Sequence, residues 1–204
     1  MTFNKAAAAT GLAVSFAMLF AVSFALAQAP GTVRVRGTIE SIDGQVLNVK
    51  ARDGAMMKVK LADNAPVNEV VKAPLSDIKE GSYIAITGTP QPDGSQRAIT
   101  IFIFPQGVHP PEGFSNWDLP NSTMTNATVA NEVASADGQT LSVKYKDGEK
   151  KIVVPPSAQI ATSVKSAMAA LKAGQKIQIF AAKKLDDGTL EAPNVSFGDY
   201  GVWR

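Results

Sequence analysis

The chain has 204 residues, of which 20 are Lys or Arg, 18 are Asp or Glu, one is His and none is Cys. The lack of cysteine excludes thiol catalysis, disulfide frameworks, iron–sulfur clusters and zinc sites built from Cys and His. A net charge of +2 is too small for a dedicated nucleic-acid-binding protein, so we expect no nucleic-acid partner. Because 45% of the residues are hydrophobic, the chain can bury one or two cores.

The first 27 residues have the pattern of a secretory signal peptide. Lys5 provides a positive charge, residues 6–27 are almost entirely apolar, and Ala25-Leu26-Ala27 places small residues where a signal peptidase cleaves. The apolar run is also long enough to span a bilayer, so an N-terminal membrane anchor is the alternative. The small residues and the break at Pro30-Gly31 favour cleavage. We therefore expect an exported, periplasmic protein with no transmembrane span after residue 27.

The remainder of the chain contains an internal duplication. Asp-Gly occurs at positions 43, 53 and 93 and again at 137, 147 and 187, so the two sets have the same spacings and an offset of 94. Apolar residues between these turns fall in the same register, with one residue deleted in the second copy, so that Ala65 matches Ala158. This regularity predicts two copies of one small domain.

Each copy has the pattern of a small β domain. Apolar and polar residues alternate over 33–40, which predicts a half-buried strand, and Gly37 lies where a bent barrel strand favours a residue without Cβ. The Asp-Gly pairs predict tight hairpins between successive strands. The third connection is longer, and in the second copy residues 163–174 predict a short helix with Ser163 as N-cap and Gly174 beyond its end.

Three strands, a helix and a two-stranded hairpin follow one another in the order of an OB-type five-stranded barrel. We therefore predict an all-β chain that folds as two tandem OB-like barrels, with a short helix in each copy. Two SH3-like barrels or β-sandwich halves, which would lack the helix, are the alternative. The predicted organisation is a signal peptide (1–27), a first barrel (28–104), a linker rich in proline and aromatic residues (105–124) and a second barrel (125–204).

The segment Trp117-Asp-Leu-Pro-Asn-Ser-Thr-Met-Thr-Asn-Ala127 resembles a stretch of exported bacterial proteins built on small OB-like domains of unknown function. Both copies are similar to this group in turn spacing. The resemblance implies an OB-like fold and export. Such proteins are often labelled metal-transporter components, but a permease role conflicts with a mature chain that has no expected membrane span.

Two candidate sites lie in and after the linker. His109, Glu112 and Asp118 together offer one imidazole and two carboxylates, which could hold a divalent metal ion. The alternative is that the aromatic residues of the linker pack it against the barrels. A second group could bind an anion or a sugar, or else serve the turn that leads into the next strand. Its members are Trp117, Asp118, Ser122, Thr123, Thr125 and Asn126.

A third candidate is the basic outer face of the second and third strands, represented by Lys50 and Lys58. Such a face could bind an anionic glycan or lipid, although exposed lysines on strands also serve to prevent edge-to-edge association.

No nucleophile motif or phosphate loop is present, so we expect no enzyme activity. The preferred function is an exported, non-catalytic binding or interaction module that uses no cofactor and meets an unidentified envelope ligand or protein partner. The alternatives are a metal-binding accessory protein of a transport system and an envelope enzyme of unknown chemistry.

Overall fold

The computed structural model describes residues 31–117, 119–135 and 138–198, which form strands and two short 3₁₀ turns. The strands are β1 (Thr32–Asp43), β2 (Val46–Ala51), β3 (Met56–Leu61), β4 (Val67–Lys72), β5 (Tyr83–Pro90), β6 (Gln96–Ile103), β7 (Gly113–Asn116), β8 (Thr123–Ser135), β9 (Gly138–Tyr145), β10 (Gly148–Val154), β11 (Gln159–Ser166), β12 (Lys176–Lys184), β13 (Leu190–Ala192) and β14 (Val195–Phe197). The 3₁₀ turns are Leu75–Asp77 and Met168–Ala170. Within the described residues, no helix is long and apolar enough to cross a membrane.

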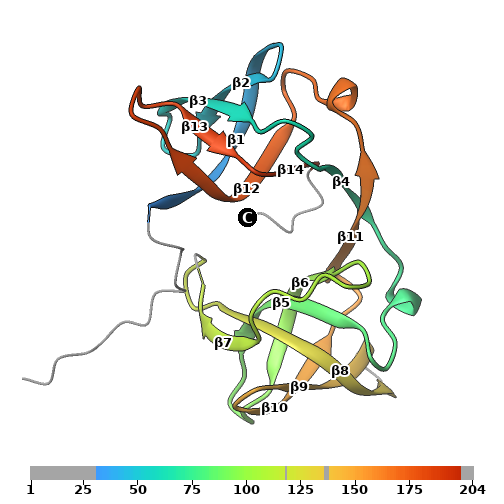
Figure 1. The fold of residues 1–204 in the computed structure, drawn as a ribbon. Coiled ribbons are helices and arrows are strands. Elements are labelled where there is room, and N and C mark those ends of the chain that lie inside the picture. Colours follow the sequence, from blue (N-terminus) through green and yellow to red (C-terminus); the bar gives the residue numbers. More distant parts are fainter. Residues whose placement is uncertain (1–30, 118, 136–137, 199–204) are drawn as a thin grey trace, which may run out of the picture.

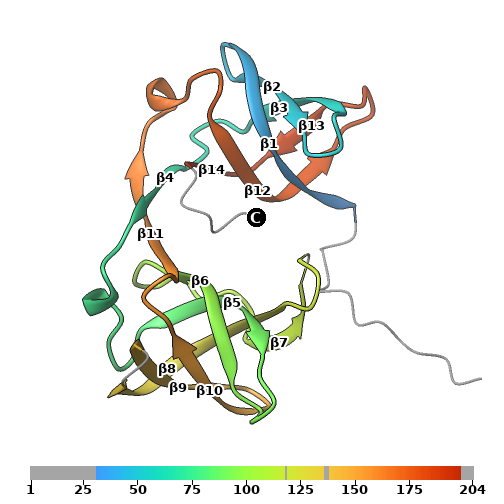
Figure 2. The same cartoon turned by 180° about the vertical axis from the view of Figure 1, so that it is seen from behind.

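Strand pairing closes two five-stranded barrels (Figures 1 and 2). In the first, called barrel A, the order is β1-β2-β3-β13-β12 and back to β1. In the second, called barrel B, the order is β8-β9-β10-β6-β5 and back to β8. The β3–β13 and β10–β6 pairs are parallel and the others are antiparallel. A three-stranded meander closed by a hairpin in this way is the OB-like arrangement, so the predicted fold class is confirmed.

The tandem arrangement is not confirmed, because each barrel takes strands from both copies. Barrel A combines β1–β3 of the first copy with β12 and β13 of the second, and barrel B combines β8–β10 with β5 and β6. The predicted division into 28–104 and 125–204 therefore does not describe the strand pairing. Both copies have the same apolar pattern, so either meander can accept either hairpin, and local sequence does not specify which one it receives.

The exchange depends on two extended connections, β4 and β11, which run from one barrel to the other and pair antiparallel (Figure 1). Val70 of β4 faces Ser163 of β11. These two positions are 93 apart, which is the offset between the copies in this segment, as for Ala65 and Ala158. Equivalent residues thus pair with each other at the centre of the ribbon. Such pairing indicates an approximate twofold symmetry that relates the two copies.

The predicted helix over 163–174 is wrong. Residues 163–166 complete β11, and Met168–Ala170 alone form a 3₁₀ turn before Gly174, whose φ is +86°. In the first copy the matching turn is Leu75–Asp77. The local pattern was compatible with a helix, but a whole strand of backbone hydrogen bonds to β4 stabilises the extended form, so tertiary pairing decides the conformation.

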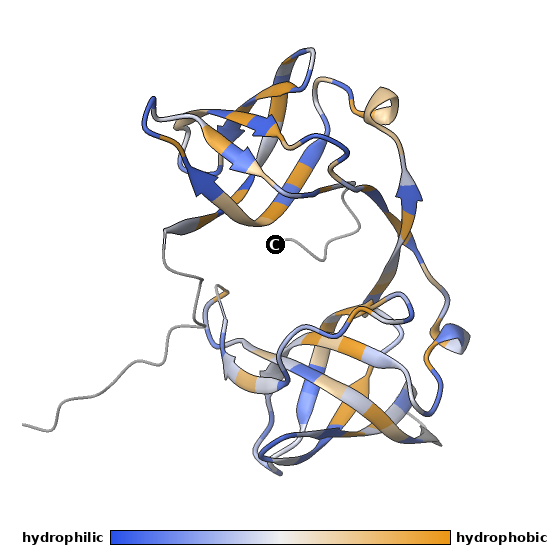
Figure 3. Cartoon of the chain, in the orientation of Figure 1, coloured by the Kyte–Doolittle hydropathy of each residue, from blue (hydrophilic) through white to orange (hydrophobic). Residues whose placement is uncertain are grey.

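Each barrel encloses its own apolar core, and each core contains residues of both copies. Hydrophobic and hydrophilic residues alternate along the barrel strands (Figure 3). In barrel A, Val35 and Ile39 of β1 pack in one cluster with Ile177 and Ile179 of β12. In barrel B, Ile84, Ile86 and Ile101 share a cluster with Leu141, Val143 and Ile152. Neither core is complete without the other copy's hairpin.

Two predictions from the sequence are confirmed: the need for glycine at position 37 and the hairpins at the Asp-Gly pairs. A Cβ at Gly37 would lie 2.3 Å from the carbonyl oxygen of Lys50, so the close approach of β1 and β2 requires glycine there. At the matched turns after β5 and β12, Asp93 and Asp187 accept hydrogen bonds from the backbone N–H groups of Ser95 and Thr189. The Ser95 hydroxyl also donates to Asp93, and this bond, followed by the backbone bond, holds the pKa of Asp93 below its usual value. For Asp187, the backbone bond from Thr189 is the largest cause of the lowered pKa.

Candidate ligand site at the junction of the barrels

The linker between β6 and β8 forms part of barrel B. Its strand β7 pairs with β8, and the chain then makes a tight turn before β8 begins. The backbone N–H of Trp117 donates to the Ser122 carbonyl at 2.9 Å, and the Ser122 hydroxyl donates to the Leu119 carbonyl at 2.7 Å. Asn121 has a φ of +56°, which asparagine tolerates better than most residues. These bonds hold the backbone N–H of Trp117 and the turn from Leu119 to Ser122.

Trp117 contacts two arginines of the other barrel. The guanidinium carbons of Arg34 and Arg36 lie 5.4 and 5.1 Å from the centre of its ring. Arg34 also lies 5.5 Å from the centre of the Phe180 ring. Because Arg34 and Arg36 are on β1 and Phe180 is on β12, these contacts join barrel A to the linker of barrel B. Strand β7, which precedes Trp117, lies on the side of the molecule away from the β4–β11 ribbon (Figures 1 and 2).

Strand alternation explains why these side chains are on the outer face of barrel A. Val35 and Ile39 point into the core, so Arg34 and Arg36 point outward. Gln178 is the cross-strand partner of Arg36 and is almost fully buried, and its side-chain oxygen has no hydrogen-bond partner among the described residues. Phe180, two residues further along β12, is 52% exposed. An exposed aromatic ring and two cations thus lie together at the junction.

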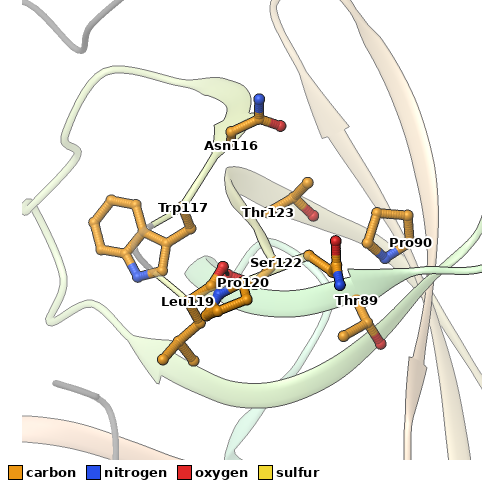
Figure 4. A pocket seen from close by; sticks show the side chains of 9 residues that line it. Thr89, Pro90, Asn116, Trp117, Leu119, Pro120, Ser122 and Thr123 are labelled. Atoms are coloured by element: carbon orange, nitrogen blue, oxygen red, sulfur yellow. Dashed lines mark hydrogen bonds between the residues drawn. The ribbon is translucent and has the colours of Figure 1, made fainter.

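Next to this contact, Trp117 also lines a pocket of about 660 Å³ (Figure 4). The polar lining residues are all uncharged, and the indole lies beside Leu119 and Pro120. The full lining is Thr89, Pro90, Asn116, Trp117, Leu119, Pro120, Asn121, Ser122 and Thr123. We call this the Trp117 pocket, and we use the term junction site for the pocket together with Arg34, Arg36 and Phe180.

A buried hydrogen-bond network supports the wall of the Trp117 pocket. Gln96 is fully buried, and its side-chain N–H donates to the Thr123 hydroxyl at 2.8 Å. The Thr125 hydroxyl donates to the side-chain oxygen of Gln96, Oε1, at 2.9 Å. A satisfied network of this kind fixes side chains in one arrangement. The Thr123 side of the pocket is therefore held in place before any ligand arrives.

The structure brings together three of the residues predicted to bind a ligand. Trp117, Ser122 and Thr123 line the pocket. Thr125 is instead fully buried and bonded to Gln96, and the Asn126 amide donates to the Pro111 carbonyl at 3.1 Å. Neither is among the pocket residues. Asp118 lies outside the described residues.

The basic face predicted from Lys50 and Lys58 is a separate surface. Both lysines are exposed, on the neighbouring strands β2 and β3 of barrel A. Neither is among the residues that line the Trp117 pocket. The structure thus places the two predicted ligand-binding surfaces on different elements.

Two of the three predicted metal ligands lie beside the same buried tyrosine. The His109 ring centre is 4.7 Å from that of Tyr83, whose hydroxyl donates to the Pro110 carbonyl. The pKa of Tyr83 is raised, chiefly by burial and further by the negative charge of Glu112. Among the residues that the structure describes, no group of three or more metal-binding side chains forms. The third predicted ligand, Asp118, lies outside the described residues.

Sequence reasoning missed the cationic part of the junction site. Arg34 and Arg36 were recognisable as the polar positions of an alternating strand, and their i, i+2 spacing places both on one face. Phe180 could have been noticed as an aromatic residue at an outward position. Nothing in the sequence indicates that Trp117, about eighty positions away, meets this face, because the contact depends on how the two barrels are joined.

Comparison of the chain with protein-family models, with curated proteins and with solved structures finds no match.

Proposed function

We propose that this protein is an exported, non-catalytic binding module that takes an anionic ligand at the junction site. The observation that supports this proposal is the position of Arg34. Its guanidinium carbon lies 5.4 Å from the centre of the Trp117 ring and 5.5 Å from the centre of the Phe180 ring, and the two rings belong to the linker of barrel B and to barrel A. A ligand at this point would contact both halves of the molecule.

The charge of Arg34 is the main physical reason to expect an anion. Within the described part of the chain, its partners are the two rings, it forms no ion pair, and its Nε is buried without a hydrogen-bond acceptor. Stacking on an aromatic face leaves the edge of a guanidinium available, and that edge matches the two oxygens of a carboxylate or similar anion. A second guanidinium, that of Arg36, lies over the same indole.

The test is calorimetric titration of the mature protein, residues 28–204, with three anionic polymers: polygalacturonate, polyglutamate and dextran sulfate. We expect at least one to bind, with an affinity that falls as salt is added. Replacing both arginines, Arg34→Gln with Arg36→Gln, should weaken binding by about tenfold or more, since each charge-assisted hydrogen bond contributes roughly 1.5–3 kcal/mol.

The matched control is Lys50→Gln with Lys58→Gln, which removes the same charge from the exposed face of β2 and β3. This variant should keep its affinity within about twofold, because distant exposed charges are screened. Binding that falls equally in both double variants, or no binding of any of the three polymers, would contradict the proposal.

A further inference from the structure

We infer that the anion recognised at the junction site is an acidic carbohydrate, with a sugar ring in the Trp117 pocket and its carboxylate at Arg34. This inference depends on the proposed function and adds the chemical class of the ligand. It starts from the lining of the pocket, which has an aromatic ring on one side and uncharged polar side chains around it (Figure 4).

The composition of the lining distinguishes a sugar from other anions. None of the nine described lining side chains is charged, so these residues offer no counter-ion for a phosphate or a carboxylate. A sugar ring has an apolar face of C–H groups and a rim of hydroxyls. The apolar face can pack on the indole of Trp117, and the hydroxyls need neutral hydrogen-bond donors and acceptors. Apolar walls with a few directed polar groups are typical of small-ligand sites.

Two asparagines provide the unused hydrogen-bonding groups. Ser122 and Thr123 already bond within the protein, to Leu119 and to Gln96. The side chains of Asn116 and Asn121, in contrast, make no hydrogen bond within the described residues and are exposed at the pocket. Each amide offers two N–H donors and one carbonyl acceptor, which suits adjacent hydroxyls of a sugar.

The backbone around the pocket is already ordered, which favours binding of a ligand with many hydroxyls. The turn that carries Trp117 and Asn121 is closed by hydrogen bonds to Ser122, and Asn116 is held in β7 by pairing with Thr123 of β8. Prior order reduces the entropy that is lost when a ligand binds. Arg34 is a charged neighbour of the pocket among the described residues, because Trp117 both lines the pocket and contacts Arg34. A carboxylate attached to the sugar ring therefore fits the two parts of the site together.

The experiment compares three probes on the mature protein by calorimetry. They are an oligogalacturonate, its fully methyl-esterified form, which has the same sugars without charge, and an oligoglutamate with an equal number of carboxylates. We expect the oligogalacturonate to bind at least about tenfold more tightly than either of the others. The methyl ester lacks the carboxylate that would contact Arg34, and the oligoglutamate lacks the sugar ring that would occupy the Trp117 pocket.

A double variant tests the sugar contacts. Asn116→Ala with Asn121→Gly removes both amides, and glycine tolerates the positive φ at position 121. It should weaken oligogalacturonate binding about tenfold while changing oligoglutamate binding less than twofold. The matched control is Asn68→Ala, on β4 outside the pocket, which should change neither affinity. A melting temperature measured for each variant verifies that it is folded.

The outcomes separate this inference from the proposed function. If the oligoglutamate binds as tightly as the oligogalacturonate and both need Arg34 and Arg36, the binding module stands and the carbohydrate inference is wrong. If the methyl ester binds as tightly as the acid, the sugar contact stands and the inference of an acidic ligand is wrong. If no anionic polymer binds, the proposed function itself fails.

Discussion

The buried side chain of Tyr83 packs against the linker, and its pKa depends on this environment. Its ring lies 5.6 Å from that of Phe104 and 4.7 Å from that of His109, and its hydroxyl donates to the Pro110 carbonyl. Burial raises the pKa of this hydroxyl, and the charge of Glu112 raises it further. The charge of the linker residue Glu112 therefore adds to the effect of burial on this ionisation in barrel B.

We predict that Glu112→Gln lowers the pKa of Tyr83 without restoring its usual value, because burial, the larger cause, is unchanged. An ultraviolet titration of tyrosinate formation measures this. A tyrosine with a raised pKa in the folded state adds stability that is complete below its unfolded pKa and is lost as the pH rises through the folded pKa. The variant should therefore lose less stability at alkaline pH. An equal effect of the exposed control Glu80→Gln would show that the shift is not specific to Glu112.

At the scale of single residues, the sequence indicated the aromatic half of the junction site but not its charged half. Trp117 was identifiable because a large aromatic residue in a proline-rich linker needs a partner. From the sequence pattern alone, Arg34 and Arg36 occupy positions on the solvent-exposed face of a strand. Their role depends on what faces them, and that is a property of the assembled molecule.

At the scale of elements, β11 is where the sequence pattern and the structure disagree. Residues 163–174 are spaced as in an amphipathic helix, yet residues 163–166 pair with β4 as a strand. The ribbon does not bury every side chain, and Val164 is 45% exposed opposite Glu69. Val164 is therefore a position at which backbone preference can be measured with little change in packing.

We predict that Val164→Ala lowers the free energy of unfolding by about 0.5–1 kcal/mol, because β-branched residues favour strands. A urea denaturation curve measures the change. If this segment were a helix, alanine would instead stabilise it, so the sign of the effect distinguishes the two conformations. Lys165→Ala is a control without a β-branched residue, and it should give a smaller change.

Other elements follow from the sequence more directly. The strands around the Asp-Gly turns, such as β2 and β3, are set by local rules, since alternation defines the buried face and the turn residues define the hairpin. These rules act over ten residues or fewer. They determine the strands and hairpins and leave open which hairpin closes which meander.

At the scale of the whole molecule, the exchange of hairpins is the main departure from the predicted organisation. Lys60 of β3 is the partner of Glu191 of β13, which belongs to the other copy. The first-copy residue equivalent to Glu191 is Arg97, at the offset of 94, and Arg97 lies instead beside Val153 in barrel B. These positions distinguish an exchanged chain from one in which each copy closes on itself.

We predict that Lys60→Cys with Glu191→Cys forms an intramolecular disulfide on oxidation, whereas Lys60→Cys with Arg97→Cys does not. Neighbouring strands lie about 4.8 Å apart, which is within the span of a disulfide, and the chain has no cysteine of its own to interfere. Mobility on a non-reducing gel and the mass of the intact chain detect the bond. Cross-linking of the second pair instead of the first would indicate two self-contained barrels.

The exchanged hairpins have a consequence for how this protein can change over evolutionary time. An ordinary duplicated domain can lose one copy, or let it diverge, while the other continues to fold. Here a deletion of either half would remove strands from both barrels, so the remaining meander would have to be closed by its own hairpin or by the hairpin of a second chain. As long as the exchange persists, a core substitution in the meander of one half is selected for its fit to the hairpin of the other half.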